Sequence, residues 1–144
     1  MQIERRKFIS SACKTCLFAG AGFLISDLIA CSTSVKIIHL PITQDSVRFP
    51  LTAFATASIQ LVRPEGWFYD IAVRKTGTDQ FEAILLECTH QQNQLLMSSN
   101  GFKCNLHGSQ FNLNGQVVKG PAERTLKKFL TSLEQGEVVI QLKS

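Results

Sequence analysis

Short apolar runs separated by turn residues make up most of the chain after residue 35. Several runs alternate between apolar and polar positions, and proline, glycine, asparagine or aspartate lies between many of them. No 3.6-residue period extends through this region, so helices are not expected there. The expected strands are 35–40, 47–49, 58–62, 67–74, 81–87, 117–118, 125–133 and 137–142. Many short strands of this kind predict an all-β sandwich or barrel-like domain.

A further hairpin is predicted within residues 91–103. Its two short runs, 94–97 and 102–103, flank the sequence Ser98-Ser99-Asn100-Gly101, and Asn-Gly is a strong hairpin turn signal. Cys88 and His90 precede this hairpin, and Cys104 and His107 follow it. We therefore expect the hairpin to bring the two Cys/His pairs to the same end of a sheet.

The mixed pairing of these residues limits which metal they can bind. Zinc accepts two cysteines and two histidines, but its usual spacing keeps like residues together. Here each pair holds one cysteine and one histidine. That pattern suits a two-iron cluster in which one iron takes two thiolates and the other takes two imidazoles. A zinc-binding structural lipoprotein is the alternative.

Three segments resemble the Rieske [2Fe–2S] family. They read Cys88-Thr89-His90, Cys104-Asn105-Leu106-His107-Gly108-Ser109-Gln110-Phe111 and Gly120-Pro121-Ala122. The resemblance implies one [2Fe–2S] cluster per chain, with Cys88 and Cys104 on one iron and His90 and His107 on the other. It also implies stacked antiparallel sheets with a small cluster-binding subdomain.

The same resemblance gives roles to residues around the cluster. Ser109 matches a serine whose hydroxyl bonds a cluster sulfur, and Phe111 stands where quinol-oxidising members often carry a tyrosine. Gly108 lies between them and the second histidine, and Pro121 belongs to a loop that covers the cluster. Two further cysteines, which form a disulfide in the quinol-oxidising members, are absent here; we matched their positions to Gln92 and Leu106. We expect a lower reduction potential than in the members that carry the disulfide.

The first 34 residues predict targeting and a membrane anchor. Glu4-Arg5-Arg6-Lys7-Phe8-Ile9 resembles a twin-arginine export signal, and the apolar run 17–25 is far shorter than the roughly 20 residues of a spanning helix. Leu28-Ile29-Ala30-Cys31 resembles a bacterial lipoprotein box, with the lipid on Cys31. We expect a signal peptide at 1–30, a lipidated tether at 31–34 and the Rieske domain at 35–144, its cluster-binding part at about 86–123. An uncleaved membrane anchor is the alternative.

Composition and net charge argue against a disordered chain and give no support for a nucleic-acid-binding protein. The chain has 44% hydrophobic and 18% charged residues, which allows a core and excludes bulk disorder, and a net charge of +4 gives no argument for nucleic acid. We expect His39 to be structural or exposed, and Trp67 and the ten phenylalanines to lie in the core. A mild basic cluster is expected to be a solvated face; it comprises Lys119, Arg124, Lys127 and Lys128.

The function expected from these observations is one-electron transfer by an exported, membrane-tethered protein on the periplasmic side. Its partner would be a redox protein or a quinol. The alternative is a subunit of a quinol-oxidising cytochrome bc-type or periplasmic oxidoreductase complex. The sequence offers no general base, nucleophile or substrate pocket, so no catalytic residue is assigned.

Overall fold

The computed structural model describes residues 36–143, and nearly all of its regular structure is β-strand. The larger sheet contains β1 (Ile37–Leu40), β2 (Ser46–Pro50), β3 (Ile59–Pro64), β4 (Ile71–Lys75), β5 (Phe81–Leu85), β10 (Lys128–Glu134) and β11 (Glu137–Gln141). The smaller sheet contains β6 (Leu96–Ser98), β7 (Gly101–Lys103), β8 (Gln110–Asn112) and β9 (Val117–Lys119). One short 3₁₀ helix, η1 (Leu51–Ala55), follows β2.

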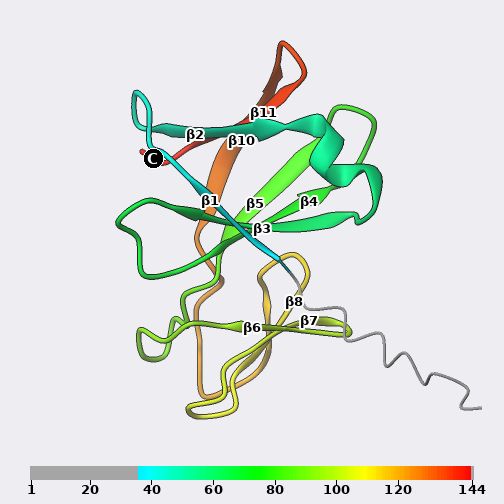
Figure 1. Ribbon diagram of the computed structural model, residues 1–144. Helices are drawn as coiled ribbons and strands as arrows, with labels where there is room; N and C mark the ends of the chain where they lie inside the picture. Colours follow the sequence, from blue (N-terminus) through cyan, green and yellow to red (C-terminus); the bar gives the residue numbers. More distant parts are fainter. Residues whose placement is uncertain (1–35, 144) are drawn as a thin grey trace, which may run out of the picture. The chain divides into compact units, whose positions relative to one another are not determined.

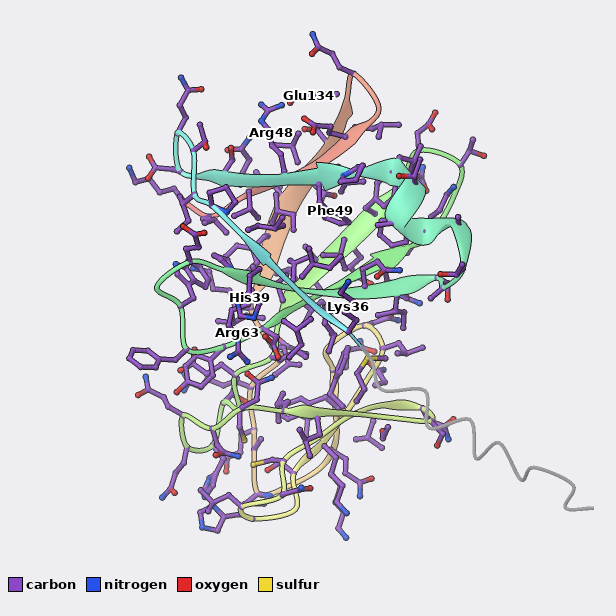
Figure 2. The ribbon with its side chains drawn as sticks, in the orientation of Figure 1. Lys36, His39, Arg48, Phe49, Arg63 and Glu134 are labelled. Atoms are coloured by element: carbon purple, nitrogen blue, oxygen red, sulfur yellow. The ribbon has the colours of Figure 1, made fainter. Side chains whose placement is uncertain are left out.

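The larger sheet has the strand order β1-β3-β4-β5-β10-β11-β2. Strand β10 joins its two parts, because Lys128 and Phe129 pair with β5 while Leu130–Glu134 pair with β11. The end strands β1 and β2 contact each other, which nearly closes the sheet into a barrel. An ion pair between Arg48 on β2 and Glu134 on β10 spans β11 at 2.9 Å (Figure 2). All pairs in this sheet are antiparallel except β1 with β3, which is parallel.

The strands β3, β4 and β5 are buried on both faces and therefore serve two cores. Val62, Val73 and Leu85 belong to the core inside the larger sheet, where Phe49 also lies (Figure 2). Their neighbours of opposite parity, Leu61, Ala72, Ile84 and Leu86, belong to a second core under the smaller sheet. Because successive strand residues point to opposite faces, one run of apolar residues can fill both cores.

The smaller sheet is an insertion between β5 and β10, with the order β6-β7-β8-β9. Figure 1 shows β6, β7 and β8 grouped on one side of the larger sheet. The inserted segment leaves and re-enters the larger sheet at adjacent points, because the Leu85 N–H donates to the Lys127 carbonyl at 2.9 Å. Its core contains Leu95, Phe102 and Phe111 together with both predicted cysteine ligands.

The expected all-β class is confirmed, but some details differ. Residues 67–70 are not strand: the Trp67 N–H closes a turn onto the Pro64 carbonyl at 3.1 Å, and Gly66 takes a positive φ of 78°. Phe68 follows this turn and is 86% exposed, so the expectation that every phenylalanine is in the core was wrong. Neither η1 nor β8 was predicted from the sequence.

The predicted hairpin is present, with its turn one residue earlier than expected. Ser98 pairs with Gly101, so Ser99 and Asn100 form the turn and Gly101 begins β7. The signal peptide, the twin-arginine motif, Cys31 and the tether all lie outside the described residues and stay predictions. Between residues 36 and 143 there is no helix with the length and hydropathy needed to cross a membrane.

Candidate metal centre

The two predicted cysteine ligands lie side by side in the second core. Cys88 follows the end of β5 and Cys104 follows β7; both are buried and neither forms a disulfide. The Cys88 N–H closes the loop that follows it, because it donates to the Asn93 carbonyl at 2.9 Å. Around Cys104, its N–H donates to the Ser109 carbonyl at 2.8 Å and its carbonyl accepts the Gly108 N–H at 3.0 Å. Two tight loops therefore present the two sulfurs to each other.

The surroundings of Cys104 favour its thiolate. Burial alone would raise the pKa of this thiol, but hydrogen bonds from the backbone of His107 and Leu106 oppose it, followed by those from the side chains of Cys88 and Asn93. The net result is a pKa below the ordinary value of 9.0. Since the thiolate is the form that binds metal, these donors prepare the sulfur for ligation.

The two predicted histidine ligands form a second pair. Their rings contact each other edge to face, with centroids 5.1 Å apart and planes at 88°. His90 and His107 are both exposed, whereas the two sulfurs are buried. Each tight loop thus contributes one buried sulfur and one exposed imidazole.

This donor set fits a [2Fe–2S] cluster. A Rieske centre needs two thiolates on one iron and two imidazoles on the other, and the structure supplies one pair of each kind. Within residues 36–143, no group of three or more His, Cys, Asp or Glu side chains is arranged to hold a single metal ion. The pairing of like donors, sulfur with sulfur and imidazole with imidazole, matches the two irons of such a cluster, each of which takes one kind of donor.

The predicted surrounding residues take distinct positions. Ser109 is fully buried, and its Oγ accepts the Ala122 N–H at 3.0 Å, which ties the Gly120-Pro121-Ala122 loop to the loop of the second pair. Phe111 is buried in the second core, Gly108 has a positive φ of 80°, and Pro121 is exposed.

A second tie joins the proline loop to the loop of the first pair. The Thr89 hydroxyl donates to the Arg124 carbonyl at 2.7 Å, and the Arg124 guanidinium donates back to the Thr89 carbonyl at 3.3 Å. Three segments that are far apart in sequence are therefore held together around the two pairs.

Asn93 is a residue near the site that the sequence analysis did not single out. Its Nδ2 lies 3.7 Å from the Cys104 sulfur, as a hydrogen-bond donor. The signal available in the sequence was its place five residues after Cys88, at the end of the first loop. Gln92, which we had matched to a missing cysteine, is exposed.

His39 and the basic cluster are exposed, as expected, although Arg124 of this cluster also bonds Thr89. His39 is exposed on β1 (Figure 2), and the four residues of the basic cluster, Lys119, Arg124, Lys127 and Lys128, are all exposed.

Comparison with known proteins agrees with this geometry. The family model described as "Rieske [2Fe-2S] domain" matches residues 57–130. Cytochrome b6-f complex iron-sulfur subunits 1 and 2 from Nicotiana tabacum chloroplasts are each 35% identical over 71 residues, which is 48% of this chain and 31% of theirs. The matched segment therefore spans about a third of the length of these curated relatives.

Two solved structures are also similar. One is a complex of reduced oxygenase and oxidized ferredoxin in carbazole 1,9a-dioxygenase. A chain of it matches with a TM-score of 0.53 and 23% identity, over 71% of this chain and 97% of its own. The other is the cyanobacterial plasma membrane Rieske protein PetC3 from Synechocystis PCC 6803. It matches with a TM-score of 0.45 and 23% identity, over 67% of this chain and 85% of its own. The family model covers half of the length of the present chain. The chain therefore belongs to the Rieske [2Fe–2S] domain family, and it carries one [2Fe–2S] cluster.

Proposed function

We propose that this protein transfers single electrons through a [2Fe–2S] cluster bound by Cys88, His90, Cys104 and His107. The observation that supports this most directly is the separation of the donors into one buried sulfur pair and one exposed imidazole pair. When bound, the cluster supplies one-electron oxidation and reduction without chemistry on a substrate. Imidazole ligation places such centres at about −150 to +300 mV, against about −400 mV for plant-type ferredoxins with four cysteines.

The exposed imidazoles would form the contact with the redox partner. Leu106, next to His107, is 55% exposed, and Pro121 is exposed on the loop tied to Ser109. The exposed apolar side chain of Leu106 and the two solvent-accessible rings form a small surface that a partner can cover. Electrons would cross where the protein layer over the cluster is thinnest.

A purified sample tests this proposal with a matched pair of histidine variants. Electron paramagnetic resonance of the reduced protein should show a [2Fe–2S] signal, and a redox titration should give its potential. His90→Gln should lose the signal and bound iron, whereas His39→Gln, at an exposed histidine on β1, should keep both. Retention of a normal signal by His90→Gln would reject the ligand assignment. Zinc in place of iron, with no visible absorption, would support the structural lipoprotein instead.

A role in a quinol-oxidising complex is the second candidate. Two observations favour it: the similarity to cytochrome b6-f iron-sulfur subunits, and a cavity of about 640 Å³ beside His90. Its lining includes Cys88 and His90 together with Arg124 and Lys127, so it opens directly onto the first pair of proposed ligands. Reduction of the purified protein by a short-chain quinol would support this candidate; reduction only by a protein donor would reject it.

We further propose that the protein is exported in folded form and held at the periplasmic side of a membrane by a lipid on Cys31. Support comes from the twin-arginine motif and the lipoprotein box, since a folded export route lets the cluster travel inside its domain. Labelling cells with a radioactive fatty acid tests the anchor: Cys31→Ala should remove the label, and Cys16→Ala, within the signal, should keep it. Label that survives Cys31→Ala would reject the proposed anchor.

A further inference from the structure

We propose that Asn93 tunes the [2Fe–2S] cluster by donating a side-chain hydrogen bond to the sulfur of Cys104. This inference rests on the proposed assignment of Cys104 as a ligand. The contact is direct: Asn93 Nδ2 lies 3.7 Å from Cys104 Sγ, within reach of a hydrogen bond to sulfur. The same nitrogen donates to the Gln94 carbonyl at 3.1 Å, so both acceptors face the amino end of the amide.

The backbone holds Asn93 in this position independently of its side chain. Its carbonyl accepts the Cys88 N–H at 2.9 Å, which closes the first ligand loop. Directly after it, Gln94 Oε1 accepts the Asp70 N–H at 3.1 Å, and the Leu95 N–H donates to the Leu86 carbonyl at 2.8 Å. These bonds fix the segment that follows the loop to the start of the second core. A change of the Asn93 side chain therefore leaves the loop closure itself intact.

Asn93 thus connects the two ligand loops. Its backbone stabilises the loop of Cys88, and its side chain reaches the cysteine of the other loop. Asn93 is only partly buried, but Cys104 is buried, so water has little access to compete for the sulfur. A hydrogen bond to a charged acceptor is stronger than one between neutral groups.

The direction of the effect follows from charge. Reduction adds one negative charge, part of which resides on the ligand sulfurs, and a donor to a sulfur stabilises that charge. Asn93 therefore favours the reduced form and raises the reduction potential. The two cysteines that form a disulfide in the quinol-oxidising members are absent here, so this amide is one of the means by which this chain can shift its potential.

Asn93→Leu tests the proposal, because leucine has a similar size and no donor. We expect the reduced-to-oxidised ratio at a given applied potential to fall about threefold, which for a one-electron couple is a shift of about −28 mV. The iron–thiolate stretching band in the resonance Raman spectrum should shift as well. Gln92→Leu is the matched control: it makes the same kind of change at the exposed neighbouring residue and should alter neither measurement.

The outcomes distinguish a hydrogen bond that tunes the cluster from a contact that has no effect on it. An Asn93→Leu protein whose potential and Raman band equal those of wild type, or change no more than those of Gln92→Leu, overturns the proposal. If Asn93→Leu fails to take up iron, Asn93→Ala replaces it: the donor is lost without added bulk or charge, and the potential must fall further than in Gln92→Ala. Wild-type protein without any [2Fe–2S] signal would instead reject the proposed function, which keeps the two failures apart.

Discussion

Replacing Ser109 by alanine tests how the buried hydroxyl supports the cluster site. Ser109 is fully buried, and its Oγ accepts the N–H of Ala122 at 3.0 Å; Ala122 is itself buried. Ser109→Ala therefore leaves a backbone donor without an acceptor, in a place that water does not reach readily. In the wild-type protein, the Ser109 oxygen is the acceptor in the bond with Ala122. The hydroxyl hydrogen of Ser109 is therefore available to donate to a cluster sulfur.

The structure sets the size of the expected loss. A buried donor left unsatisfied costs about 1–3 kcal/mol. For a domain of this size, each kcal/mol lowers the melting temperature by roughly 4–8 °C. We expect Ser109→Ala to melt about 5–20 °C below wild type. The reduction potential should also fall, by up to about 59 mV if the reduced form loses a factor of ten.

Ser46→Ala is the control for this experiment. Ser46 is also buried, and its hydroxyl donates to the Thr43 carbonyl at 2.8 Å, but it lies on β2 and takes no part in the second core. Thr43 is exposed and its carbonyl also accepts the Ser46 N–H, so the loss should stay below about 1 kcal/mol. The potential should not change. Calorimetry and redox titration of the two variants decide the matter: equal melting temperatures, or equal potentials, would refute the reasoning.

Three further predictions address packing, redox tuning and pH. Gly101→Ala should lose more than about 4 kcal/mol and fail to bind iron, because its Cβ would lie 2.0 Å from the Phe111 carbonyl oxygen. Gly136→Ala, also at positive φ but in open space, should cost only about 1–2 kcal/mol in a denaturant titration. Phe111→Tyr should raise the potential by up to about 59 mV if its hydroxyl donates to a cluster sulfur; an unchanged titration would contradict this. Burial of Glu82 opposes ionisation, but hydrogen bonds from Lys128 and Arg74 outweigh it and hold its pKa below 4.5. Its ion pairs therefore stabilise the fold above about pH 4.5, and this contribution is lost as pH falls through the lowered pKa. Glu82→Gln should reduce stability by about 1 kcal/mol at pH 7 and by less at pH 3. Glu134→Gln, which affects an exposed pair, should change the acid denaturation curve little.

The sequence predicted those parts of the fold that depend on local patterns. Short apolar runs identified most strands, because strands such as β3 and β4 bury side chains on both faces of the sheet. The hairpin of β6 and β7 followed from its turn residues. Strand β8 could not be predicted, since Gln110-Phe111-Asn112 is mostly polar and becomes a strand only by pairing between β7 and β9.

Tertiary contacts explain the remaining errors. Residues 67–70 have high strand propensity, but the turn at Gly66 and the bond between the buried Asp70 carboxylate and Arg63 Nε at 2.7 Å fix another conformation. For the site, the motif predicted which four side chains would pair, and the structure brings them together as two pairs. Asn93 was not recognised, because its place five residues after Cys88 does not reveal its distance to Cys104 across two loops.

The place where the inserted segment joins the larger sheet has a consequence for how such a protein can vary. Its two ends lie next to each other at Leu85 and Lys127, so the segment is an insertion whose length does not affect the pairing of the strands on either side. Loops within it can be lengthened, or the whole unit exchanged, while the surrounding strands keep their pairing. Leu61, Ala72 and Ile84 of the larger sheet pack against the inserted segment in the second core. These three side chains would have to change together with the segment, so they should determine which inserted segments the larger sheet can accommodate.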